Sequence, residues 1–245
     1  MTHGDRINFG MSSTLVLAEP SSASLTPQQV AAMIDHTLLK PDATRAQVEQ
    51  LCHEAVEHRF ACAFVNPTWV PLSVAITRGT GLAIGAPVGF PLGANLTATK
   101  RAEAADLVRV GARELDMVLN VGALKSGDRK LVQNDIAAIA EIAHGSGALL
   151  KVILENCLLS LEEKIVACEL SVAAGADFVK TSTGFSTSGA TTDDVALMRG
   201  VVGDRAGVKA SGGIRSAQDA LAMIAAGATR IGTSSGVKIV SELAG

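Results

Sequence analysis

Two lysines stand at the carboxyl ends of short apolar segments, one predicted strand–helix unit apart. Lys180 ends the segment 177–180 and Lys209 ends the segment 207–209. A strand buried on both faces seldom carries an unpaired ammonium group, because removing the charge from water is costly. A second ammonium nearby lowers the pKa of a lysine, and a partly neutral amine can attack a carbonyl to form a Schiff base. The pair therefore predicts imine chemistry.

Carboxylates hold similar positions on other segments. Asp35 ends the first apolar segment and Asp116 lies near the end of the fourth, so both are candidate reactive groups. The alternative is that Asp35, Asp116 or Glu155 only neutralises a lysine. We interpret Lys151, on the fifth segment, as a charge partner inside the protein.

Loops rich in glycine and serine follow the last three apolar segments. They contain Gly184, the run 211–213 and the run 232–236. Small residues let backbone N–H groups approach a phosphate closely, and a helix N-terminus adds a favourable dipole. The loops therefore predict a phosphate site to which Arg215 could add charge, although glycine and serine also form ordinary turns.

A regular scaffold must position these residues. From residue 25 onward, the sequence alternates between two kinds of segment. Alanine-rich segments of helical period alternate with short apolar runs that suit buried parallel strands. Glycines 111, 147, 175 and 227 follow the helical segments, where a left-handed residue ends a helix at low cost. Ser160 with Glu163 and Ser216 with Asp219 have the spacing of capping boxes.

Eight strand candidates result, each followed by a helical segment. They are 33–35, 61–65, 82–87, 113–118, 149–154, 177–180, 207–209 and 229–231. Eight such units predict an α/β fold, a closed (β/α)₈ TIM barrel, in which the active site lies at the carboxyl ends of the strands. A doubly wound open sheet is the alternative, but the sequence lacks the GxGxxG and Walker A patterns. We expect one domain over 25–245, preceded by a flexible N-terminal extension over 1–24.

Composition narrows the class of protein. The formal charge is −3 and aromatic residues make up 3%, which argues against a nucleic-acid or anionic-membrane partner. No apolar run reaches the ~20 residues of a membrane-spanning helix. The four cysteines form no CxxC pair, so we expect free buried thiols in a reducing cytoplasm and no metal site.

Several blocks, in the same order, resemble deoxyribose-phosphate aldolases, which are class I aldolases. The resemblance runs from about residue 34 to residue 240, and the blocks read IDHTLLKP (34–41), ELDMVLN (114–120), FVKTSTGF (178–185), VKASGGIR (208–215) and RIGTSSG (230–236). The resemblance implies a TIM barrel without metal or organic cofactor. It implies reversible cleavage of 2-deoxy-D-ribose 5-phosphate to D-glyceraldehyde 3-phosphate and acetaldehyde, a lyase reaction of deoxyribonucleotide catabolism, by a cytoplasmic homodimer.

The resemblance also implies roles for single residues. Lys180 matches the Schiff-base lysine, Lys209 the assisting lysine and Asp116 the acid–base group. The positions that match substrate-binding residues are Asp35, Thr37, Gly184, Gly212, Gly213, Ser234 and Ser235.

The chain departs from some members at two positions. Phe64 stands where many have a cysteine, while Cys62 should point the same way one layer deeper. Phe185 stands where some have a lysine near the phosphate. His36 should point away from the pocket as a packed or surface histidine.

Two other classes of function stay open on sequence grounds. One is a sugar-phosphate isomerase or lyase that forms no imine. The other is a non-catalytic module that binds a phosphorylated metabolite, although such a module has no need of a lysine with a lowered pKa.

Overall fold

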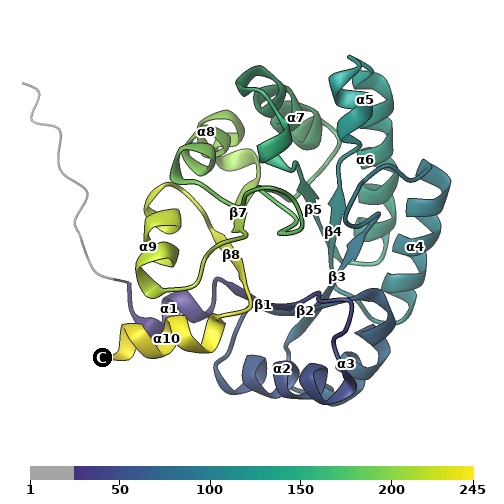
Figure 1. Cartoon of the computed structure of the whole chain (residues 1–245). Coiled ribbons are helices and arrows are strands. Elements are labelled where there is room, and N and C mark those ends of the chain that lie inside the picture. The colour runs from purple at the N-terminus through teal and green to yellow at the C-terminus, as the bar shows by residue number, and fades with distance from the viewer. Residues whose placement is uncertain (1–24) are drawn as a thin grey trace, which may run out of the picture.

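The computed structural model describes residues 25–245, which form a closed barrel of eight parallel strands inside a ring of helices (Figure 1). The strands are β1 (Ile34–Leu38), β2 (Cys62–Val65), β3 (Ala83–Val88), β4 (Glu114–Val118), β5 (Leu149–Ile153), β6 (Phe178–Lys180), β7 (Gly207–Ser211) and β8 (Arg230–Thr233). They pair in chain order, and β8 closes on β1. The predicted TIM barrel is confirmed. The predicted extension lies outside the described residues.

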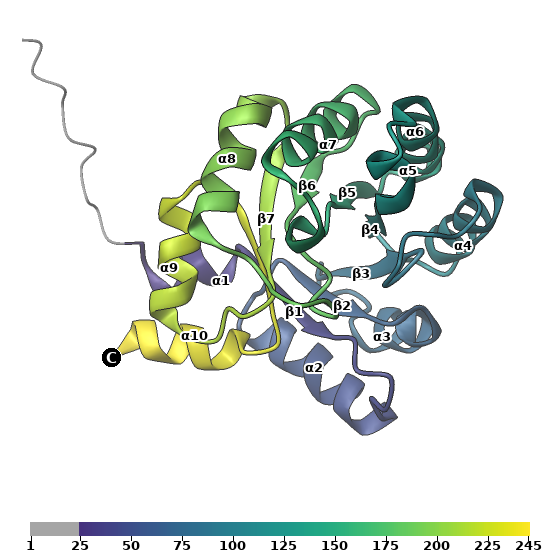
Figure 2. The same cartoon turned by 45° about the horizontal axis from the view of Figure 1, so that its top comes forward.

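The helices run back outside the strands (Figure 2). The α-helices are α1 (Pro27–Ala31), α2 (Arg45–Glu57), α3 (Val70–Ile76), α4 (Thr97–Arg109), α5 (Val121–Lys125), α6 (Arg129–Gly145), α7 (Leu161–Ala173), α8 (Thr192–Val202), α9 (Ala217–Ala225) and α10 (Gly236–Ala244). Short 3₁₀ turns are η1 (Pro67–Trp69), η2 (Asn156–Leu158) and η3 (Gly203–Arg205). Across residues 25–245 we find no helix with both the length and the apolar character needed to cross a bilayer.

Local signals in the sequence set the ends of these elements. Both predicted capping boxes are present: Ser160 accepts a hydrogen bond from the backbone N–H of Glu163, and Ser216 from that of Asp219. The four joint glycines have positive φ, from 68° at Gly147 to 112° at Gly227, as expected after helix ends. Helix starts and stops are therefore encoded locally.

The strand limits correct two positions. Asp35 is the second residue of β1, and Lys209 is the third of five residues in β7, so neither ends its strand as predicted. Only Lys180 is the last residue of its strand. The apolar runs stop early at polar side chains, but backbone pairing continues past these side chains, which lie inside the barrel.

Two separate interiors are buried. The main hydrophobic core fills the shell between strands and helices. Buried Cys62, Phe64 and Ile153 lie outside that core. Because strand residues alternate between the two faces of a sheet, these three share the inner face of the barrel with its charged residues.

Candidate active site

The inside of the barrel is filled by layers of side chains from alternate strands. Moving from the amino to the carboxyl ends of the strands, the even strands contribute Cys62, Glu114, Phe178 and Arg230. The odd strands then contribute Asp35, Gly85, Lys151 and Lys209, and the even strands contribute Phe64, Asp116, Lys180 and Gly232. This is the layered packing typical of TIM barrels, here built mainly from charged groups.

Lys180 is the uppermost of the interior lysines. Its ammonium Nζ donates a hydrogen bond to Asp116 Oδ2 at 2.8 Å, and the side chain is only 4% exposed. Burial lowers the pKa of Lys180; Asp116 opposes this, and the charges of Lys209 and Lys151 lower it further, to about 8. A neutral amine is therefore accessible near physiological pH. Burial, rather than the neighbouring ammonium we predicted from sequence, is the largest cause.

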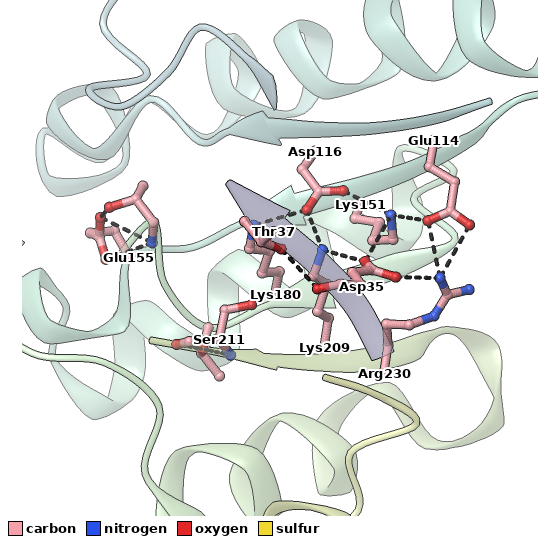
Figure 3. Close-up of polar contacts among 12 residues, drawn as sticks. Asp35, Thr37, Glu114, Asp116, Lys151, Glu155, Lys180, Lys209, Ser211 and Arg230 are labelled. Carbon is pink, nitrogen blue, oxygen red and sulfur yellow. Dashed lines mark hydrogen bonds and ion pairs between the residues drawn. The ribbon is translucent and has the colours of Figure 1, made fainter. Parts of the chain in front are cut away.

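Asp116 joins the three lysines. Its Oδ2 accepts hydrogen bonds from Lys180 and Lys209, both at 2.8 Å, and its Oδ1 accepts one from Lys151 at 2.8 Å (Figure 3). Burial would raise the pKa of Asp116, but the three ammonium groups hold it well below its usual range. The carboxylate is thus ionised and placed to exchange a proton with Lys180 or Lys209.

Lys209 and Lys151 also contact carboxylates nearer the amino ends of the strands. Lys209 also donates to Asp35, and Lys151 donates to Glu114 Oε2 at 2.5 Å. Burial would raise the pKa of Asp35, but Lys209, Lys151 and Arg230 lower it to about 2. The reading of Lys151 as an interior charge partner is confirmed. The lysines do pair with carboxylates, yet Lys180 keeps a lowered pKa.

Phe64 forms the apolar wall behind the ammonium groups. The centre of its ring lies 4.5 Å from Lys209 Nζ, 5.3 Å from Lys180 Nζ and 5.6 Å from Lys151 Nζ. A Cβ on Gly85 would collide with both Phe64 and Cys62, so these two side chains point the same way, as predicted. Phe64 offers no acceptor, but the negative face of its ring attracts the three cations.

A pocket of about 330 Å³ opens above Lys180. It is lined by the loops after β6, β7, β8 and β1, and includes four predicted binding glycines and serines together with Thr37: Gly184, Gly212, Gly213 and Ser234. Asp35 and Ser235 do not line it; Asp35 is buried below, and Ser235 precedes α10. Arg215 lines it as anticipated, as does Lys40, which sequence reasoning missed despite its place in the block 34–41.

The loop after β6 is fixed from β5. The Glu155 carboxylate accepts hydrogen bonds from the backbone N–H and the hydroxyl of Thr183. Glu155 itself has a left-handed backbone, with φ of 57°, which aims its side chain at this loop. Its role was not recognised from sequence as more than a counter-ion. Phe185, two residues after Thr183 in the same loop, is 51% exposed and packs edge-on against Phe90.

His36 lies outside the barrel, as predicted. It is buried, packs against Phe60 with ring centroids 5.1 Å apart, and has Nε2 2.8 Å from Glu54. The cysteines are free thiols, but Cys157 is only half-buried, which corrects the expectation that all are buried. Asp35, Cys62 and Glu114 offer grouped metal-ligand atoms, yet both carboxylates already bind cationic side chains.

Comparisons with known proteins agree on one family. Residues 29–242 match the model of the family described as DeoC/LacD family aldolase. The chain is 59% identical to deoxyribose-phosphate aldolase of a Geobacillus species over 211 residues, covering 86% of this chain and 94% of that one. It is 60% identical to the Brevibacillus brevis deoxyribose-phosphate aldolase over 208 residues, covering 85% and 93%.

Solved structures give the same result. The tetrameric deoxyribose phosphate aldolase from Aeropyrum pernix superposes with a TM-score of 0.84 at 37% identity, covering 89% of this chain and 92% of that one. Sequence and fold therefore agree over nearly all of the barrel, and this chain belongs to the DeoC/LacD family of aldolases.

Proposed function

We propose that this protein is a deoxyribose-phosphate aldolase that cleaves 2-deoxy-D-ribose 5-phosphate reversibly to D-glyceraldehyde 3-phosphate and acetaldehyde. One observation carries the proposal: Lys180 lines an open pocket, has a pKa of about 8, and contacts Asp116. Identities of 59% and 60% to deoxyribose-phosphate aldolases support the choice of substrate.

The reaction begins with Lys180. Its neutral Nζ attacks the aldehyde carbon of the open-chain sugar, and loss of water from the carbinolamine gives an iminium. Asp116, which holds both Lys180 and Lys209 through Oδ2, serves as the group that moves protons during this dehydration. Lys209 assists by donating to the same carboxylate oxygen.

Carbon–carbon cleavage follows from the iminium. A base takes the proton of the hydroxyl on the β-carbon, the bond between the α- and β-carbons breaks, and its electron pair moves to the iminium to give an enamine. The β-carbon becomes the aldehyde of glyceraldehyde 3-phosphate, which leaves. The enamine carbon is then protonated, and water hydrolyses the imine to acetaldehyde and free Lys180. Asp116 with Lys209, through a water molecule, supplies these proton transfers. The iminium is the electron sink, so we propose that no metal or organic cofactor takes part.

The loops after β6 to β8 hold the phosphate. Gly184, Gly212, Gly213 and Ser234 offer backbone or hydroxyl donors, and Arg215 adds charge. Thr37, on β1, lines the same pocket. Binding of the phosphate by these loops holds the far end of the substrate and aligns the carbon–carbon bond that breaks next to Lys180. Asp35 acts from below, through Lys209.

We also propose a cytoplasmic homodimer. Four free thiols fit a reducing compartment. The Aeropyrum pernix relative is a tetramer, so self-association is expected while the dimer itself stays a prediction. Mass measurement by light scattering tests it: twice the chain mass supports the dimer, and any other mass contradicts it.

Trapping tests the proposed function. The protein is incubated with acetaldehyde and borohydride, and its peptides are analysed by mass spectrometry. We expect the reduced two-carbon adduct on Lys180, together with turnover of 2-deoxy-D-ribose 5-phosphate in a coupled assay that EDTA leaves unchanged. An adduct only on other lysines would contradict the role of Lys180 as the nucleophile, and turnover without an adduct would favour a sugar-phosphate enzyme that forms no imine. Ligand binding without turnover would favour the binding module.

A further inference from the structure

Six charged side chains inside the barrel form one closed ring of ion pairs; five of them are buried, and the sixth, Arg230, is 13% exposed. Asp116 binds Lys151, Lys151 binds Glu114, Glu114 binds Arg230, Arg230 binds Asp35, Asp35 binds Lys209, and Lys209 returns to Asp116. The guanidinium of Arg230 lies 3.1 Å from the Glu114 carboxylate and 2.6 Å from the Asp35 carboxylate. Figure 3 shows the ring closing on itself to the right of Lys180. We call these six residues the ion-pair ring.

The ion-pair ring is balanced without Lys180. It contains three cations and three carboxylates, and every member touches at least two partners of opposite charge. Lys151 also lies 3.6 Å from Asp35, across the ring. Lys180 is the seventh charge and reaches only Asp116 Oδ2, an oxygen that Lys209 already uses. Buried charge is costly unless it is compensated. The surplus cation is therefore the one at the mouth.

We propose that Glu114 and Arg230 are positioning residues whose opposite charges keep the ion-pair ring balanced. Among residues 25–245, Lys180 is then the one cation inside the barrel that lacks a full counter-charge. This inference rests on the proposed role of Lys180 as nucleophile. Neither Glu114 nor Arg230 lines the pocket. They act through Lys151 and Asp35, the ring members that link them to Asp116 and Lys209.

Other groups near the ion-pair ring do not disturb its balance. On β2, burial raises the pKa of the Cys62 thiol well above its usual value, so the thiol stays neutral. On β3 the inward positions are Gly85 and Pro87, and on β6 the Phe178 ring lies 5.4 Å from the Arg230 guanidinium. After β5, the Glu155 carboxylate is held by Thr183. The cations of the pocket rim, Lys40 and Arg215, are exposed to solvent.

The proposal predicts that removing the charge of Arg230 and removing the charge of Glu114 shift the pKa of Lys180 in opposite directions. Arg230→Gln removes a cation, so the ring gains a surplus carboxylate and the pKa of Lys180 rises by about one pH unit. Glu114→Gln removes an anion, so the pKa of Lys180 falls by about one pH unit. The double variant keeps the balance, and its Lys180 should titrate within a few tenths of a pH unit of the wild type.

Competitive labelling measures this titration directly. The whole chain is treated with trace acetic anhydride across a pH series, and acetylation of the Lys180 peptide is quantified by mass spectrometry. This readout needs no aldolase activity. If the variants show the expected labelling shifts but the wild type does not turn over 2-deoxy-D-ribose 5-phosphate, the proposed function alone is contradicted. If the wild type turns over this sugar but the variants show no labelling shift, the ion-pair ring alone is contradicted. The pH dependence of turnover should move in the same direction as the labelling.

Charge-preserving variants separate charge from packing. Arg230→Lys and Glu114→Asp alter the contacts but keep the balance, so Lys180 should titrate near the wild-type pH in both. Circular dichroism confirms that each variant is folded. Shifts of the same sign in Arg230→Gln and Glu114→Gln, or no shift in either, overturn the proposal. If Arg230→Gln does not fold, Glu114→Gln alone decides, because a titration at or above the wild-type pH overturns it.

Discussion

The middle of the barrel and its mouth each bury a lysine in contact with Asp116, but the two lysines differ in electrostatics. Lys151, in the middle, is fully buried and touches both Glu114 and Asp116. Burial would lower the pKa of Lys151, but the carboxylates raise it well above its ordinary value. Lys180, at the mouth, shares one oxygen of Asp116, and burial lowers its pKa to about 8. The number of carboxylates that each amine contacts, not its depth, decides whether it is a fixed cation or a nucleophile.

Replacing each lysine in turn should produce the largest contrast. Lys180→Met removes the nucleophile, so turnover should fall on the order of 10⁴-fold or more and borohydride trapping should vanish. Lys151→Met leaves the nucleophile in place, so trapping on Lys180 should persist but should require a higher pH. The measurement is steady-state turnover with peptide mass spectrometry. Loss of trapping in both variants would contradict the assignment of Lys180 as the nucleophile and Lys151 as a fixed cation.

Neutralising the carboxylate that they share should separate imine formation from proton transfer. In Asp116→Asn the charge that raises the pKa of Lys180 is removed, so acetaldehyde should still be trapped at neutral pH. Turnover should nevertheless fall by about 10²- to 10⁴-fold, the usual contribution of a general acid–base group. Thermal unfolding serves as the folding control. Near-normal turnover in this variant would remove Asp116 from the mechanism.

The pH dependence of turnover by the wild type should follow the titration of Lys180 at the mouth of the barrel, and not that of Lys151 in the middle. Because the pKa of Lys180 is lowered to about 8, the neutral amine becomes dominant as the pH rises through that value. We expect kcat/KM to fall about tenfold for each pH unit below the midpoint and to level off above it. A profile that keeps rising to pH 10 would show that Lys180 titrates as an ordinary lysine.

The smallest effect is expected at the rim. Arg215→Gln removes one charge from the pocket, so KM for the phosphorylated sugar should rise about tenfold, or about 1.4 kcal/mol, with little change in kcat. Arg109→Gln, at the end of α4 and not among the residues that line the pocket, is the matched control and should leave KM unchanged. The effect should also disappear for an unphosphorylated aldehyde. Equal losses with both aldehydes would argue against a phosphate contact.

The sequence predicted the scaffold well because its signals are local. Capping boxes at Ser160 and Ser216 and positive-φ glycines at the helix ends are decided within a few residues, and they divide the chain into eight repeating units. The strand ends were less accurate. Asp35 and Lys209 interrupt the apolar pattern because they face a charged interior, a feature that hydrophobicity alone reads as the end of a strand.

The sequence predicted which residues belong to the candidate site, but not which contacts join its segments. Lys180, Lys209 and Asp116 were chosen from their strand positions and from family resemblance, and the barrel brings both lysines into direct contact with Asp116. The loop contact between Glu155 and Thr183, and the place of Lys40 on the pocket, were missed. Each joins segments from different units, which no local pattern in the chain records.

By itself, the sequence determined which residues could form an imine and the repeating unit that carries them. Tertiary structure decided which lysine has the lowered pKa. Glu114 and Arg230 lie 116 residues apart in the chain yet form one ion pair, and only closure of β8 against β1 brings the ends of the ion-pair ring together. A pKa depends on the distances to every charge nearby, and those distances exist only once the barrel is closed.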